Sequence, residues 1–70
     1  MAKDIKQKLG RRIKELRVKE GYSQEEFASR CGLHRTYISD IERGERNISV
    51  ENIEKIAKAL EIRPDELLRF

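Results

Sequence analysis

The segment QEEFASRCGLHRTYISDIER, residues 24–43, decides the fold of this 70-residue chain. Its apolar residues recur at helical spacing on both sides of Gly32, which predicts two short helices joined by a turn. Such a turn needs a positive φ, and glycine adopts it without a side-chain penalty. Ala28 stands where the two helices must cross closely, so a small side chain is required there. The segment therefore predicts a helix-turn-helix, whose inward residues are Phe27, Cys31, Leu33, Ile38 and Ile41.

The outward side of the second predicted helix carries a varied set of polar groups. Its members are Arg35, Thr36, Tyr37, Ser39, Asp40 and Arg43. They offer hydrogen-bond donors and acceptors, a methyl group and an aromatic ring, which are the groups that read base edges in a major groove. This side of the helix is therefore the candidate surface for base recognition.

Four predicted helix starts share one motif, the hydrophobic staple, in which an apolar residue before the N-cap packs against one in the first turn or just after it. At the first of them, Tyr22 and Phe27 flank Ser23, and Glu26 completes a capping box with that serine. The other three starts have the pairs Leu33 and Ile38 around His34, Ile48 and Ile53 around Ser49, and Ile62 and Leu67 around Arg63. Helix starts near residues 24, 35, 50 and 64 follow from this pattern.

The whole chain is predicted to be all-α, a compact domain of five short helices. They span about residues 4–19, 24–31, 35–43, 50–60 and 64–69. Gly10 lies inside the first helix and weakens it by up to about 1 kcal/mol relative to alanine. No stretch alternates as a strand would. The predicted core consists of Leu9, Ile13, Leu16, Phe27, Ala28, Cys31, Leu33, Ile38, Ile41, Ile53, Ile56, Ala57, Leu60 and Leu67.

The length of the chain predicts one domain, residues 1–70. Such a chain buries only about 60% of its unfolded surface, so a partner subunit is the expected source of extra stability. The single Cys31 excludes an intramolecular disulfide. Neither an apolar run of about 18 residues, as a membrane span needs, nor a signal peptide is seen. We expect a cytoplasmic protein with no membrane partner.

The charge is distributed unevenly along the chain. Residues 1–20 carry eight Lys and Arg against three Asp and Glu, whereas residues 47–70 carry four against five. A basic front half and a near-neutral rear half indicate one face for a polyanion and another face for a different partner. A merely solvated helix face is the alternative, so charge alone does not decide between them.

The segment GLHRTYISDIERGERNIS, residues 32–49, carries a family resemblance. From Leu9 to Leu68 the chain resembles the phage repressor and Cro helix-turn-helix (XRE) family, which implies a lambda-repressor-like fold. The segment is similar to the controller proteins of restriction–modification systems, which are small homodimers that bind palindromic operators. The resemblance implies a sequence-specific DNA-binding transcription regulator of this kind. The alternative is a phage-type repressor, or an antitoxin that acts mainly through a protein partner.

The resemblance also implies roles for single residues. Arg35, Thr36, Ser39 and Asp40 fall where the family reads bases, and Arg35 can bond bidentately to guanine. Tyr37 is added to them as a contact with a thymine methyl, a sugar or a phosphate. Contacts with the DNA backbone are expected from Ser23, Gln24, His34, Arg43, Arg46 and Asn47.

Two acidic residues of the second motif helix, Asp40 and Glu42, have separate expected roles. The family pairs the counterpart of Glu42 with an arginine of the first helix, which implies a partly buried pair between Arg17 and Glu42. Asp40 has three open roles. It can accept from cytosine N4, orient Arg43 from three residues away, or weaken non-specific binding by its charge.

Other classes of function find little support in the sequence. Cys31 and His34 are three residues apart but have no second pair nearby, whereas a zinc site needs about four ligands. No nucleophile–base pair and no glycine-rich phosphate loop are present. We therefore expect no metal, no cofactor and no enzymatic activity.

The end of the chain carries more apolar residues than its core needs, and such a surplus indicates an interface. The predicted dimer surface consists of Val50, Ile62, Leu67, Leu68 and Phe70 on the last two helices. A twofold homodimer would place two recognition helices about 34 Å apart, one turn of a palindromic double-stranded DNA operator. The bound dimer would repress by covering a promoter, or activate by contacting RNA polymerase.

Overall fold

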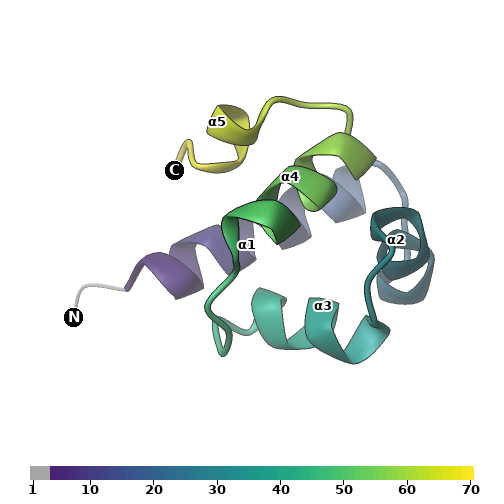
Figure 1. Ribbon diagram of the computed structural model, residues 1–70, viewed down its shortest axis with the longest axis horizontal. Coiled ribbons are helices and arrows are strands. Elements are labelled where there is room, and N and C mark those ends of the chain that lie inside the picture. The colour runs from purple at the N-terminus through teal and green to yellow at the C-terminus, as the bar shows by residue number, and fades with distance from the viewer. Residues whose placement is uncertain (1–3) are drawn as a thin grey trace.

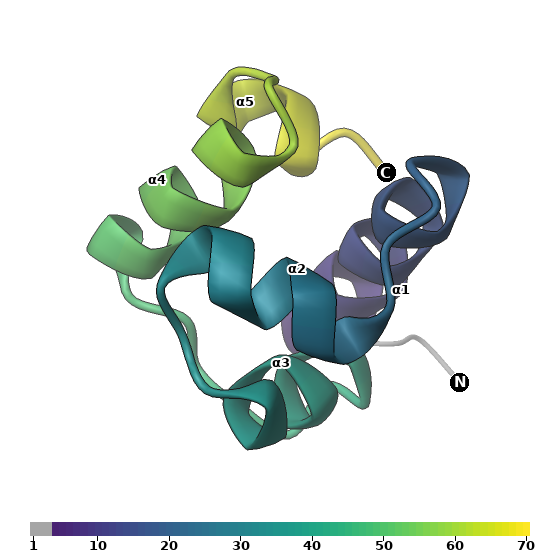
Figure 2. The same cartoon turned by 90° about the vertical axis from the view of Figure 1, so that its right-hand side faces the viewer.

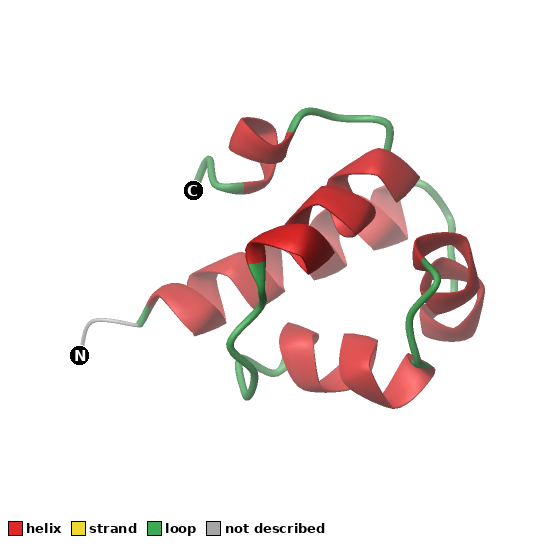
Figure 3. Ribbon diagram, in the orientation of Figure 1, coloured by secondary structure: helices red, strands yellow, loops and turns green. Residues whose placement is uncertain are grey.

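The computed structural model describes residues 4–70, which form five helices (Figure 1). Residues 4–70 contain no strand, as the red helices and green loops of Figure 3 show. The all-α prediction is confirmed, and every helix start lies within one residue of its predicted position. The helices are α1 (Ile5–Lys19), α2 (Gln24–Cys31), α3 (Arg35–Glu42), α4 (Val50–Ala59) and α5 (Pro64–Leu67).

Three helices end earlier than predicted, because the residue at each end caps the helix instead of extending it. Arg43 caps α3 and is followed by Gly44 at φ +76°. Leu60 caps α4 and is followed by Glu61 at φ +58°, a left-handed conformation that glycine normally supplies. Leu68 caps α5, so this helix ends at Leu67, two residues before the predicted end.

Side-chain caps begin three of the helices. The side chains of Asp4, Ser23 and Ser49 each accept a hydrogen bond from the backbone N–H three residues later, at 3.0–3.1 Å. This contact satisfies one of the free N–H groups of a first helical turn. The Glu26 carboxylate of the predicted capping box lies instead 3.7 Å from Arg30 Nη2.

The helices pack around a single apolar cluster. Helix α1 packs against α3 and α5, α2 packs against α3 and α4, and α4 packs against α5 (Figure 2). Most of the predicted core residues are buried, whereas Leu16, Leu33 and Ile53 lie half-buried at its edge. The buried residues are Leu9, Ile13, Phe27, Ala28, Cys31, Ile38, Ile41, Ile56, Ala57, Leu60 and Leu67.

The short helix α5 corrects one prediction about the dimer surface. Leu67 is 0% exposed, because the single turn that begins at Pro64 directs it into the core. Its assignment to a dimer surface is therefore wrong. Arg12 of α1 helps to hold this turn in place, since its Nε and Nη2 donate to the Glu66 carbonyl oxygen at 3.2 and 2.9 Å.

None of the helices within residues 4–70 combines the length and the apolar character that crossing a membrane requires.

Candidate nucleic-acid interface

Helix α3 lies at one edge of the molecule, at the bottom of both Figure 1 and Figure 2. The turn before it contains Gly32 at φ +71°, and Leu33 N donates to the Ala28 carbonyl oxygen at 2.9 Å. Ala28 itself is buried at the helix crossing, as predicted. His34 occupies the N-cap position of α3 without a side-chain capping bond, and its side chain is exposed. The side chains of Ile38 and Ile41 are buried in the core, so the opposite side of α3 faces outward.

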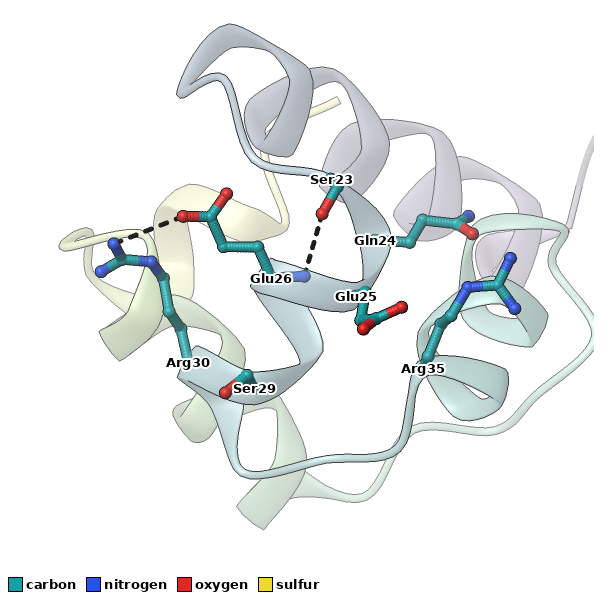
Figure 4. Close-up of a pocket in the computed structure, with 7 residues that line it drawn as sticks. All are labelled: Ser23, Gln24, Glu25, Glu26, Ser29, Arg30 and Arg35. Carbon is teal, nitrogen blue, oxygen red and sulfur yellow. Dashed lines mark hydrogen bonds and ion pairs between the residues drawn. The ribbon is translucent and has the colours of Figure 1, made fainter.

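An open hollow runs along α2 and reaches Arg35 at the start of α3 (Figure 4). Arg35 and Thr36, the first residues of α3, are exposed. Ser23 caps α2, whose first turn presents free N–H groups suited to an anion. The hollow is lined by Ser23, Gln24, Glu25, Glu26, Ser29, Arg30 and Arg35. The structure thus brings the strongest predicted base reader beside two predicted backbone contacts.

Asp40 connects the arginines at the far end of α3. Its carboxylate accepts from Arg43 Nη2 at 2.6 Å and from Arg46 Nε at 3.3 Å. Arg43 Nη1 also donates to Ser39 Oγ at 2.7 Å. The sequence left three roles open for Asp40. In this structure Asp40 orients Arg43, which is the second of them, and it also orients Arg46. Both arginines are about half exposed, and Asn47 after them is exposed.

Tyr37 of α3 is contacted by residues from outside that helix. The residue is half-buried, and its hydroxyl accepts from Asn52 Nδ2 of α4 at 2.9 Å. The Arg46 guanidinium lies over the ring, 5.1 Å from its centroid. Asn52 could not be predicted as part of this surface, because no local sequence pattern pairs a residue of α4 with a tyrosine of α3.

The predicted pair of Arg17 and Glu42 is present and joins three helices. The Glu42 carboxylate accepts from Arg17 Nε at 2.7 Å, from Arg17 Nη2 at 3.1 Å and from Gln24 Nε2 at 3.0 Å. Arg17 Nη1 donates to the Tyr22 carbonyl oxygen at 2.7 Å. The two charged side chains are only 10% and 3% exposed. The Gln24 side chain, expected to reach DNA, is thus engaged with Glu42 in this structure.

Gly10 sets the distance between α1 and α3. A Cβ atom at this position would lie 2.2 Å from the Ile41 carbonyl oxygen and 3.1 Å from that of Glu42. Both atoms belong to the backbone, so neither can rotate away. From the sequence, Gly10 is only a weak point of its helix, but the structure shows that it permits a close approach of two backbones.

Cys31 is a core residue. It is 6% exposed, and burial raises the pKa of its thiol to about 11. A thiol of this kind is a poor nucleophile and a poor metal ligand near neutral pH. Residues 4–70 bring together no group of three or more His, Cys, Asp or Glu side chains that could hold a metal ion.

The fold and this surface define a helix-turn-helix protein, and comparisons with known proteins agree. A family model described as "Helix-turn-helix" matches residues 13–67. Control protein C.BamHI of Bacillus amyloliquefaciens is 52% identical over 71 residues, covering 100% of this chain and 88% of that protein. The crystal structure of the restriction-modification controller protein C.AhdI from Aeromonas hydrophila has a TM-score of 0.87 at 50% identity, covering 89% of this chain and 94% of that chain.

A third relative is the master regulator for biofilm formation SinR, whose crystal structure is in complex with DNA. It has a TM-score of 0.83 at 37% identity, covering 87% of this chain and 98% of that chain. The chain therefore belongs to the helix-turn-helix family, whose members are DNA-binding transcription regulators. Its predicted likeness to restriction–modification control proteins is confirmed by the matches to C.BamHI and C.AhdI.

Proposed function

We propose that this protein is a restriction–modification controller that binds a palindromic DNA operator as a homodimer and thereby regulates transcription. The observation that carries the proposal is the outward face of α3. It combines exposed donors at its start with a fixed cluster of arginines at its end. The similarity to C.BamHI and C.AhdI supports the controller role.

The surface divides into groups for bases and groups for phosphates. In the major groove, Arg35 and Thr36 at the start of α3 read base edges. Tyr37, Ser39 and Asp40 follow along the helix and complete the reading side. The DNA backbone is contacted by Ser23, Gln24, His34, Arg43, Arg46 and Asn47. For Gln24 the contact is assigned to its backbone N–H at the start of α2, because its side chain is bonded to Glu42.

Two variants separate base reading from phosphate contact. Arg35→Ala should weaken binding to the preferred duplex by about 1–3 kcal/mol and relax the preference at one base position. Arg46→Ala should weaken all duplexes alike and lower the salt dependence by about one unit of slope. Both are measured on the duplex that the wild-type protein selects from a random pool. The exposed Lys58 near the end of α4 supplies the control, Lys58→Ala. Unchanged affinity and preference in Arg35→Ala would show that α3 is not the reading helix.

The dimer is proposed to form through α4 and α5. Val50 is 82% exposed, Leu68 is 44% exposed and Phe70 is 56% exposed. Ile62, the fourth proposed residue of this surface, is half-buried. Large apolar side chains at such exposure are suited to burial against a second subunit. A C2 dimer also matches the symmetry of a palindromic operator.

Charge placed on this surface should dissociate the dimer. Val50→Asp is a suitable change, because an acidic residue in the first turn of α4 favours the helix itself. We expect at least a tenfold rise in the dimer dissociation constant by analytical ultracentrifugation, a loss of about 1.4 kcal/mol. Ile5, which is 63% exposed and is the first residue of α1 as Val50 is of α4, gives the matched control Ile5→Asp, with no such rise. A wild-type protein that stays monomeric at micromolar concentration would contradict the proposal.

A further inference from the structure

The hydroxyl group of Tyr37 is the one group of the proposed reading set that a different helix holds. Asn52 Nδ2 donates to Tyr37 Oη at 2.9 Å, and this contact is partly buried. Asn52 is in turn fixed in the first turn of α4, where its backbone N–H donates to Ser49 Oγ at 3.1 Å. The Arg46 guanidinium over the ring, 5.1 Å from its centroid, packs against Tyr37 as well. Tyr37 is therefore contacted on two sides, at its hydroxyl by Asn52 and at its ring by Arg46.

This contact also sets the direction of the hydroxyl hydrogen bond. A tyrosine hydroxyl has one proton to donate and an oxygen that accepts. The amide N–H of Asn52 already occupies the acceptor, so the O–H proton is turned away from Asn52 and is available as a donor. The Tyr37 O–H can therefore donate to an acceptor on DNA. Suitable acceptors are a phosphate oxygen or a base-edge atom such as thymine O4 or purine N7.

We infer that Asn52 is a positioning residue of the DNA-reading surface, which fixes Tyr37 as a hydrogen-bond donor toward an acceptor on DNA. The inference rests on the proposed function and adds to it a residue outside the helix-turn-helix segment. It also links α4, a helix of the proposed dimer surface, to the reading side of α3. The positioning role of Asn52 acts through Tyr37, to which its side chain donates.

The substitution Asn52→Asp tests the direction of the bond, because it preserves the shape of the side chain and reverses its hydrogen-bond role. The carboxylate of the variant accepts the Tyr37 proton, which leaves only an oxygen lone pair to meet an acceptor on DNA. The added negative charge is controlled by Ser49→Asp. That change places a charge at the same end of α4 and retains an N-cap residue.

The experiment is a double-mutant cycle with Tyr37→Phe, which keeps the ring under Arg46 and removes only the hydroxyl. Affinity is measured for the duplex selected by the wild-type protein and for an unrelated duplex, and thermal unfolding is recorded for each variant. We expect Asn52→Asp to weaken binding about fivefold more than Ser49→Asp, the size of one hydrogen bond. In the Tyr37→Phe background, Asn52→Asp and Ser49→Asp should have equal effects.

The outcomes are distinct. A loss confined to the selected duplex supports a base acceptor, and an equal loss on both duplexes supports a phosphate acceptor. The same extra loss with and without the Tyr37 hydroxyl overturns the inference, as does an Asn52→Asp variant that binds like Ser49→Asp. If the wild-type protein selects no duplex from the pool, or Arg35→Ala changes nothing, the proposed function itself fails.

Discussion

Replacing Glu42 with leucine is expected to lower the free energy of unfolding by about 3–5 kcal/mol. The substitution leaves the Arg17 guanidinium in a site where its side chain is only 10% exposed, with the Tyr22 carbonyl oxygen as its remaining partner. It also leaves Gln24 Nε2 without its acceptor. A chain of this size has a total stability of about 4–10 kcal/mol, so the substitution should remove a large fraction of it.

The measurement is urea denaturation of Glu42→Leu, Arg17→Met and the double variant. Removing both charges exchanges a buried ion pair for apolar side chains of similar size, which is often neutral or stabilising. We therefore expect the double variant to unfold within about 2 kcal/mol of the wild type, far above either single variant. Losses that simply add in the double variant would show that the pair is not coupled in this way.

The double variant also separates stability from position. Glu42 is the last residue of α3, and its carboxylate joins that helix to α1 and to the start of α2. Apolar side chains can fill the same space, but they do not reproduce three directed hydrogen bonds. If the pair sets the orientation of α3, the double variant should fold well and still bind the selected duplex more weakly than the wild type. Wild-type affinity in the double variant would limit the pair to a role in stability.

The helices and most of the core could be predicted from the sequence, because their signals are local. Ser23 and Ser49 are N-caps in the structure, and Tyr22 stacks on Phe27 with ring centroids 6.2 Å apart. Capping and periodicity act over three or four residues, so they can be read along a chain. The predicted ends of the helices were less accurate, since Glu61 takes a left-handed conformation without being a glycine.

The contacts that position the candidate site were harder to predict, because they join residues far apart in the sequence. Arg17 and Glu42 were paired only through the family resemblance. Asn52 lies 15 residues from Tyr37, and Arg12 lies 54 residues from Glu66, so neither contact leaves a local pattern. The apolar surplus at the end of the chain did indicate exposed side chains. Leu67 was assigned both to the core and to the dimer surface, and the way in which the single turn of α5 docks places it in the core.

Replacing Gly10 with alanine is expected to destabilise the fold by about 2 kcal/mol or more, although alanine is the better helix former. The gain in helix propensity is about 1 kcal/mol, whereas overpacking against rigid backbone typically costs 1–3 kcal/mol and occasionally more. Here the new Cβ would stand 2.2 Å from the Ile41 carbonyl oxygen, far inside van der Waals contact, so the overpacking cost should lie at or above the upper end of that range. Helices α1 and α3 must therefore separate, and the Glu42 hydrogen bonds stretch with them.

Thermal unfolding measures the first effect, and a shift of roughly 4–8 °C per kcal/mol is expected for a chain of this size. Gly32→Ala is the matched control. Its φ of +71° penalises any side chain, but no atom lies within 4 Å of the new Cβ. The control should therefore lose only about 1–2 kcal/mol from backbone strain. DNA affinity measured well below both unfolding temperatures should fall in Gly10→Ala, because α3 is displaced from its place against α1. A Gly10→Ala protein that is as stable as the wild type would show that the two backbones separate without cost.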